Sequence, residues 1–137
     1  MIKTYIGKLQ KTGKIIESKC KLYDEYNNTY YLPNDLFEEN KIKSTNSRTD
    51  LYKYKVYNNS IGESVTKDSD GKTIYTGDEV EIYYYEKNNS TKRFKIRATV
   101  IYDNKAQLYY MRTIDNQVFL FTGDTQHFIS KIIRIGR

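Results

Sequence analysis

The stretch EVEIYYYEKNNSTKRFKIRATVIY, residues 79–102, decides the fold that we expect for this chain. Glu79–Tyr85 alternates charged and apolar residues, which is typical of a strand with one buried face. Lys87–Thr91 is polar and is predicted to be the loop of a hairpin. Lys92–Tyr102 is the longest alternating segment of the chain. Two such strands joined by a short polar loop predict an antiparallel hairpin.

The two faces of this hairpin differ in chemistry. In the first strand Val80 and Ile82 are expected to point inward, while Glu79 and Glu81 point outward. In the longer strand one face carries Phe94, Ile96, Ala98, Val100 and Tyr102, and the other carries Arg93, Lys95, Arg97 and Thr99. Because side chains alternate between faces along a strand, we expect one apolar face and one face with a row of cations.

Further strands are predicted on both sides of the hairpin. Alternation bounded by polar turns is found at Met1–Leu9 (broken at Gly7), Ile15–Tyr23, Thr29–Leu32, Leu51–Tyr57, Thr73–Tyr75, Gln107–Thr113, Val118–Thr122 and Phe128–Ile135. Asn34–Ile42 is the best helix candidate, because Asn34 or Asp35 can cap its start, and Lys43–Thr49 is expected to be a loop. The turn-rich stretch Asn58–Gly71 is the expected domain boundary. Short strands at regular spacing predict a small barrel or sandwich.

The composition excludes several classes of protein. The chain has 137 residues, of which 38% are hydrophobic, with 15 tyrosines and no tryptophan, so much of the core must be tyrosine. One cysteine and one histidine exclude an intramolecular disulfide, a cysteine zinc site and a histidine metal cluster. No apolar run reaches the roughly 18 residues of a membrane span, and the polar start Met1–Gln10 is not that of a signal peptide. We therefore expect a cytoplasmic protein with no cofactor.

Few residues indicate catalysis. The glycine-rich loops that hold phosphates are missing from the sequence. A nucleophile needs a base beside it, and His127 with Cys20 or a serine is the arrangement that the composition allows. We expect His127 to be a turn or edge residue and Cys20 to be a small core residue. If the chain were an enzyme, loss of His127 or Asp78 would abolish its turnover.

A calcium loop is a second possibility at the D-x-D-G pattern of Asp68 and Asp70. Glu79 stands at the twelfth position from Asp68, where such a loop ends in glutamate. However, Lys72 and Ile74 occupy ligand positions, and helices are not expected on either side. We therefore prefer a hairpin turn for this segment.

Basic and aromatic residues gather around the hairpin and form the candidate contact surface. The net charge is +6, and most of the excess lies after residue 70. Tyr83–Tyr85, Tyr109 and Tyr110 are expected on adjacent strands. From these groups we select Lys92, Arg93, Lys95, Arg97, Tyr84 and Tyr109 as the residues that bind a macromolecule. Cations with aromatic rings are typical of single-stranded nucleic-acid sites, of protein interfaces, and also of an ordinary solvated strand face.

The run IGESVTKDSDGKTIYTGDEVEIYYYE, residues 61–86, resembles the YopX-like family of small phage and prophage proteins. The residues that match the family's pattern are Asp68, Gly71, Lys72, Ile74, Tyr75, Gly77, Asp78 and Val80. The resemblance extends at most over the C-terminal half, since residues 1–60 match the usual family opening poorly. It implies a small SH3-like barrel, with Gly71 and Gly77 in tight turns and Ile74 and Val80 pointing inward.

The resemblance also implies a phage-encoded accessory protein without catalysis. Lysine, isoleucine, asparagine and tyrosine, which have AT-rich codons, are abundant, as in a low-GC bacterium or its phage. We expect stoichiometric binding that inhibits or modulates a host protein complex, such as a defence nuclease (anti-CRISPR-type inhibition). Direct binding of nucleic acid by the same face is the alternative, and an enzyme is the third interpretation.

The expected architecture is mainly β (α+β) and has two domains. Residues 1–58 are predicted to form a β-meander with one short helix, and residues 59–137 a YopX-like, SH3-like small β-barrel. The expected partner is a host protein or nucleoprotein complex in the bacterial cytoplasm, and no membrane is expected. Exposed barrel edges could pair two copies, but no heptad or apolar stripe indicates this, so the oligomeric state stays open.

Overall fold

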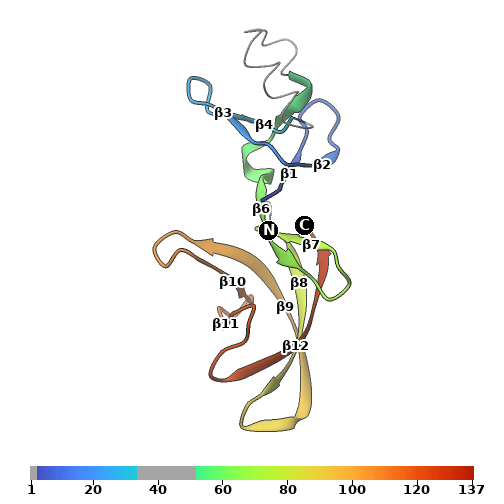
Figure 1. Cartoon of the computed structure of the whole chain (residues 1–137), viewed down its shortest axis with the longest axis vertical. Helices are drawn as coiled ribbons and strands as arrows, with labels where there is room; N and C mark the ends of the chain where they lie inside the picture. The colour runs from blue at the N-terminus through green and yellow to red at the C-terminus, as the bar shows by residue number, and fades with distance from the viewer. Residues whose placement is uncertain (1–2, 34–51) are drawn as a thin grey trace. The chain divides into compact units, whose positions relative to one another are not determined.

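The computed structural model describes residues 3–33 and 52–137, and these residues are mainly β (Figure 1). The chain divides into two compact units, Met1–Ser64 and Val65–Arg137, whereas the boundary predicted from the sequence follows residue 58. The helix predicted at Asn34–Ile42 and the loop predicted at Lys43–Thr49 lie outside the described residues. In the two described ranges, we find no helix with the length and apolar character needed to cross a membrane.

The first unit consists of short antiparallel strands. They are β1 (Tyr5–Lys8), β2 (Ile15–Ser18), β3 (Leu22–Asp24), β4 (Thr29–Tyr31), β5 (Lys55–Val56) and the start of β6 (Gly62–Lys67), with 3-10 helices η1 (Tyr52–Tyr54) and η2 (Asn58–Ser60). β1 pairs with β2 and β6, and β4 lies between β3 and β5. The core side chains are Ile6, Cys20, Leu32, Tyr54 and Val56. Cys20 is therefore a core residue, as predicted.

The single strand predicted over Ile15–Tyr23 is wrong, because the chain turns at Ser18. The Ser18 hydroxyl accepts the N–H of Cys20 at 3.0 Å and donates to the carbonyl of Pro33. The bond with Cys20 is local and the bond with Pro33 is not, and together they replace the ladder that a continuous strand would need. The segment is consequently two strands, β2 and β3, which pair with different partners.

Two further predictions in this unit are wrong. Gly7 does not interrupt its strand but pairs with Ile16 inside β1. A Cβ atom on Gly7 would lie 2.9 Å from Leu32 Cδ1, so the glycine is needed for the close approach of this side chain. The strand predicted over Leu51–Tyr57 is η1 followed by the two-residue β5 in its described part, with the ring of Tyr54 in the core.

The second unit is built on a five-stranded antiparallel sheet that curls into a half-barrel (Figure 1). The five strands of this sheet are β8 (Glu79–Glu86), β9 (Asn89–Asp103), β10 (Leu108–Arg112), β11 (Val118–Phe119) and β12 (His127–Gly136), and the unit also contains β7 (Thr73–Tyr75). The sheet order is β11-β10-β9-β8-β12, and β7 lies beside β6. The buried core is formed by Ile74, Val80, Ile82, Tyr84, Ala98, Val100, Met111 and Phe119.

The hairpin predicted at residues 79–102 is confirmed. β8 and β9 pair from Glu79 opposite Thr99 to Tyr85 opposite Arg93. The loop is shorter than predicted, because β8 ends at Glu86 and β9 begins at Asn89. The inward set of Val80 and Ile82 on β8 is also confirmed, since both are fully buried.

The strand β6 was missed, because the stretch around it was assigned to turns. Gly62 and Ser64 occupy its buried positions, so the segment shows no apolar alternation. Ser64 is compatible with burial because its hydroxyl accepts the N–H of Thr4 at 2.9 Å. The expected turn follows directly after β6, where Gly71 has a φ of +85°.

Candidate macromolecule-binding surface

The outer face of the β8–β9 hairpin carries three of the predicted contact residues. Arg93, Lys95 and Arg97 are exposed at alternate positions of β9. The β8 residues opposite them are Tyr85, Tyr83 and Glu81, in that order. Because alternate residues of a strand share a face, the three cations form the row that the sequence predicted.

Tyr84 does not belong to this face, which corrects the prediction. Its side chain points into the core and is only 8% exposed. The ring centroid lies 4.9 Å from that of Phe119, 5.2 Å from His127 and 5.4 Å from Phe94. Burial, together with two nearby carboxylates, raises the pKa of Tyr84. Because every second residue of a strand lies on the same face, the inward positions predicted for Val80 and Ile82 already required Tyr84 to point inward.

Tyr109 and Lys92 are also separated from the row of cations. Tyr109 lies opposite Tyr102 on β9, and the two ring centroids are 4.8 Å apart. Lys92 Nζ lies 5.1 Å from the centroid of the Phe94 ring. Tyr102 and Phe94 lie on the face of β9 opposite the row of cations, because side chains alternate along the strand. Tyr109 and Lys92, which contact them, therefore belong to that other side of the sheet.

Tyr83 and Lys131, which we did not select from the sequence, complete the outer face. The guanidinium carbon of Arg93 lies 4.7 Å from the centroid of the Tyr83 ring, and Lys131 Nζ lies 5.7 Å from it. The Tyr83 hydroxyl donates to Glu81 Oε1 at 2.8 Å. This hydrogen bond, then burial and the Glu81 charge, raise the pKa of Tyr83 against the opposing effect of Arg93.

We call the set Tyr83, Tyr85, Arg93, Lys95, Arg97 and Lys131 the basic–tyrosine face. The alternation of side chains along β8 could have identified Tyr83 and Tyr85, because they stand at every second position after Glu79 and Glu81 and so lie on the same face. Lys131 could not be found in this way. It reaches the face only because β12 pairs with β8, which brings Lys131 opposite Tyr83.

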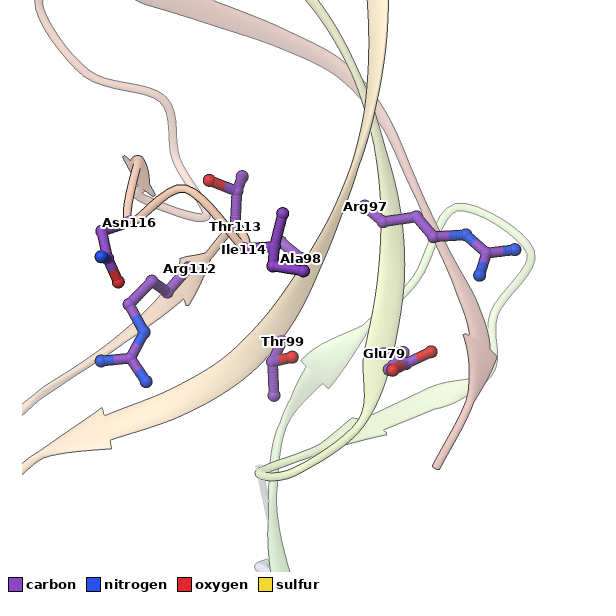
Figure 2. A pocket seen from close by; sticks show the side chains of 8 residues that line it. All are labelled: Glu79, Arg97, Ala98, Thr99, Arg112, Thr113, Ile114 and Asn116. Carbon is purple, nitrogen blue, oxygen red and sulfur yellow. The ribbon is translucent and has the colours of Figure 1, made fainter.

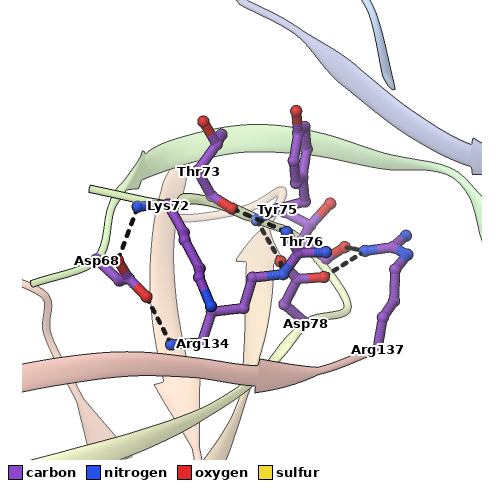
Figure 3. A network of polar contacts seen from close by, with 8 residues as sticks. All are labelled: Asp68, Lys72, Thr73, Tyr75, Thr76, Asp78, Arg134 and Arg137. Carbon is purple, nitrogen blue, oxygen red and sulfur yellow. Dashed lines mark hydrogen bonds and ion pairs between the residues drawn. The ribbon is translucent and has the colours of Figure 1, made fainter. Parts of the chain in front are cut away.

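Asp78 is buried and forms a cluster with two partly exposed arginines (Figure 3). Its Oδ2 is 3.0 Å from Arg134 Nε and accepts the N–H of Tyr75 at 2.8 Å. Its Oδ1 accepts a hydrogen bond of 2.9 Å from Arg137, which also donates to the carbonyl of Thr76. The Asp78 side chain has no exposed surface. The cluster therefore ties β12 to the turn between β7 and β8.

Asp68 stabilises the turn between β6 and β7 (Figure 3). Its Oδ1 accepts the N–H groups of Asp70 at 2.9 Å and Lys72 at 2.8 Å, and its Oδ2 accepts that of Arg134 at 2.9 Å. Burial opposes the charge, but these donors and the charge of Lys72 outweigh it and lower the pKa of Asp68. The D-x-D-G pattern is thus a hairpin turn, and Asp68 also anchors β12. Within residues 3–33 and 52–137, the structure contains no group of three or more metal-ligating side chains.

His127 begins β12 and lies against the core. Its Nδ1 is 3.1 Å from both carboxylate oxygens of Asp124, and its ring centroid is 4.5 Å from that of Phe119. Burial opposes ionisation of Asp124, but the hydrogen bonds from His127 and from the N–H of Gln126 lower its pKa. A cavity of about 320 Å³ adjoins this pair, lined by Glu86, Lys87, Asn88, Thr125, Gln126 and His127. The pair of His127 and Asp124 orients the loop before β12, which agrees with the predicted role of His127 as a turn or edge residue.

A notch of about 490 Å³ lies where β10 ends beside β9 (Figure 2). It is lined by Glu79, Arg97, Ala98, Thr99, Arg112, Thr113, Ile114 and Asn116. Figure 2 shows the side chains of Arg97 and Arg112 extending to opposite sides of Thr99. Ile114 at the rim is fully exposed. The notch therefore joins the basic–tyrosine face to the end of β10.

Comparison of the chain with models of protein families, with curated proteins and with solved structures finds no match.

Proposed function

We propose that this chain is a phage-encoded accessory protein without catalytic activity, which binds and inhibits or modulates a host protein complex through the basic–tyrosine face. A defence nuclease is one such complex, as for inhibitors of the anti-CRISPR type. The observation that carries the proposal is the arrangement of Arg93 and Lys131 over the ring of Tyr83. Tyrosine and arginine are enriched at the energetic centres of protein interfaces.

Two features of the face favour a protein over a nucleic acid. Two cations already lie over the ring of Tyr83, where a base would have to stack. Glu79 and Glu81 share the face with the cations, and Glu81 lies directly opposite Arg97. Carboxylates at these positions repel phosphates but can pair with cations of a protein partner.

Direct binding of nucleic acid is the second candidate. The observation that favours it is the row of Arg93, Lys95 and Arg97, which is extended by Lys131 from the neighbouring strand. Four cations on one face can neutralise several phosphates of a backbone. Such binding would weaken steeply with salt, because each neutralised phosphate releases a counterion.

The SH3-like barrel and the YopX-like relationship are part of the same proposal. The matching residues Gly71 and Gly77 have φ values of +85° and +89°, which glycine adopts without strain. Asp68 and Asp78 bind β12 through main-chain and arginine donors. These four residues stabilise turns and strand contacts. Their roles support the interpretation that the motif maintains a scaffold and does not form an active site.

The test is affinity capture from a nuclease-treated lysate of a low-GC bacterium. The tagged wild-type chain is compared with the Arg93→Glu/Arg97→Glu variant. Lys11→Glu/Lys14→Glu is the matched control, since it makes the same change of charge at exposed positions of the β1–β2 turn. We expect the wild type and the control to retain one host complex in stoichiometric amount, and the face variant to lose it.

Anisotropy with labelled oligothymidine and duplex DNA distinguishes the second candidate. We expect no binding of either probe at physiological salt. Tight binding that falls steeply with salt and disappears in the Arg93→Glu/Arg97→Glu variant would replace the first proposal by the second. Capture that is equal for all three chains would refute a role for the basic–tyrosine face.

A further inference from the structure

The strand β9 extends well beyond its neighbour β10. β9 runs over Asn89–Asp103, but β10 pairs only with its residues from Thr99 to Asp103. The preceding part of β9 has β8 on one side and no strand on the other. This part contains Arg93, Lys95 and Arg97.

The hydrogen bonds of Val100 show which main-chain groups of β9 face the unpaired side. Val100 donates its N–H to the carbonyl of Asp78, and its own carbonyl accepts the N–H of Gly77, so Val100 faces the β8 side. Main-chain direction alternates along a strand. The N–H and C=O groups of Arg93, Lys95 and Arg97 therefore face away from β8. Among the residues that the structure describes, none bonds to these groups. We call them the open edge.

On the other edge of the same sheet, β12 is bonded to the turn between β6 and β7 at Ile132 and Arg134. Ile132 donates its N–H to Ser69 Oγ at 3.0 Å and accepts the N–H of Ser69 at 2.8 Å. Arg134 donates its N–H to Asp68 Oδ2 at 2.9 Å. We call this the capped edge. On β12 the outward N–H groups of Ile132 and Arg134 thus have partners within the chain, whereas the outward groups of Arg93, Lys95 and Arg97 on β9 have none among the described residues.

The notch described above marks where a strand added to the open edge would meet β10. β10 ends at Arg112, opposite Thr99, and the turn of Thr113–Asn116 then leads to β11, on the side of β10 away from β9. Arg97 and Ala98 are among the residues that line this notch, whose whole volume is about 490 Å³ (Figure 2). An extended segment can therefore enter beside Arg97 without displacing β10.

We propose that an extended segment of the partner protein, acidic at alternate positions, adds to the open edge as a sixth strand of the sheet. This inference rests on the proposed function, because it names the part of the protein partner that is bound. Main-chain bonds to Arg93, Lys95 and Arg97 would hold the segment, as in other complexes formed by strand addition.

The positive charge of the open edge favours an acidic segment as its occupant. Directly opposite residues on neighbouring strands lie about 5 Å apart on the same face. Residues opposite Arg93, Lys95 and Arg97 therefore meet a cation at every second position, and acidic residues fit there. The residues between them lie opposite Phe94 and Ile96, which are half-buried and favour apolar side chains. A second copy of this chain would bring two rows of cations together, which is unfavourable.

The test uses a synthetic seven-residue peptide of alternating glutamate and valine with blocked ends, titrated into the ¹⁵N-labelled full chain. Lys95→Pro is compared with Lys95→Ala, since both remove the charge but only proline removes the open-edge N–H. We expect saturable shifts of the Arg93, Lys95 and Arg97 amides, slower hydrogen exchange at these N–H groups, and a Kd at least tenfold weaker for Lys95→Pro than for Lys95→Ala.

Two measurements on the wild-type chain keep the test independent of the variants. A peptide with the same composition in block order, and one methylated at its main-chain nitrogens, should both bind at least tenfold more weakly. Equal binding of all three peptides, or of the two Lys95 variants, would overturn strand addition. Shifts at Lys131 and Tyr83 without the open-edge amides would locate acidic binding on the basic–tyrosine face. The proposed function would then stand and this inference would fail. Binding of oligothymidine, but not of the peptide, would contradict both.

Discussion

The two edges of the second unit's sheet are built by opposite means, although both belong to long strands. On the capped edge, Ser69 and Asp68 supply side-chain oxygens to the N–H groups of Ile132 and Arg134. On the open edge, Arg93, Lys95 and Arg97 carry charge but leave their outward main-chain groups unbonded within the described chain. Charged side chains protect an exposed edge from self-association without filling it. One edge is thus bonded within the chain, and the other is the edge to which we propose that a partner segment adds.

The largest expected effect is on the capped side, at Asp78. Asp78→Ala removes a carboxylate without exposed surface and leaves Arg134 and Arg137 without this partner. Breaking a buried ion pair in this way costs about 3–5 kcal/mol. We expect the free energy of unfolding, measured by urea denaturation, to fall by about this amount. Asp70→Ala, an exposed aspartate in the neighbouring turn, is the control and should change it little. A loss below about 1 kcal/mol for Asp78→Ala would contradict the assigned role of the cluster.

A smaller loss is expected for Asp68→Asn, which weakens three main-chain hydrogen bonds. Leaving such donors poorly matched costs about 1–3 kcal/mol. The pKa of Asp68 lies below its ordinary value of 3.8 in the folded chain. Its stabilising effect is therefore complete above the unfolded pKa and is lost as pH falls through the folded pKa.

This linkage gives a direct measurement. The difference in unfolding free energy between the wild type and Asp68→Asn should be constant from pH 7 to about 5 and should shrink below about pH 4. Asp124 also has a lowered pKa, and it acts in both chains, so its effect cancels in the difference. A difference that grows on acidification has the wrong sign for an ionised Asp68.

Ser69→Ala should have a still smaller effect. It removes the hydroxyl that accepts the N–H of Ile132, while the bond from the Ser69 N–H to the Ile132 carbonyl remains. A single hydrogen bond near solvent contributes about 0.5–1.5 kcal/mol. Hydrogen exchange of the Ile132 amide should accelerate, and that of the Val80 amide inside the sheet should not. Unchanged exchange at Ile132 would show that the capped edge does not depend on Ser69.

The smallest effect is expected on the open edge. Lys95→Pro should differ from Lys95→Ala by less than about 0.5 kcal/mol in unfolding free energy, because the N–H that proline removes has no partner in the described chain. Thr99→Pro is the control, since it lies on the same side of β9 where β10 is paired. It should lose more than about 1 kcal/mol. Similar losses for the two proline variants would mean that the edge at Lys95 is bonded after all.

Alternation along the chain predicted the hairpin of β8 and β9, because an apolar and a charged face distinguish the two sides of each strand. The same alternation applies at Tyr84, whose predicted place on the contact surface rested on its aromatic ring and not on its position along the strand. Because side chains alternate between the two faces of a strand, the inward positions of Val80 and Ile82 were sufficient to place Tyr84 in the core and Tyr83 outside. This part of the candidate surface was therefore predictable from the residues alone.

Other features left no such pattern. β6 was missed because Gly62 and Ser64 occupy buried positions, and small polar residues carry no apolar period. The division of β2 from β3 depends on two bonds of the Ser18 hydroxyl, one of them to Pro33, which folding brings near. Bonds of this kind override local propensity, because a buried hydroxyl must find its partners wherever the fold places them.

The order of residues was enough to establish a mainly β chain, one strong hairpin and a row of cations on its outer face, since these depend on a period of two along single strands. It could not reveal that Lys131 joins Tyr83, that Asp68 and Asp78 bind the last strand, or that β10 stops short of Arg97. These features arise between segments distant in sequence. Strand pairing and strand length set them, because a main-chain group has a partner only where a neighbouring strand or side chain reaches it.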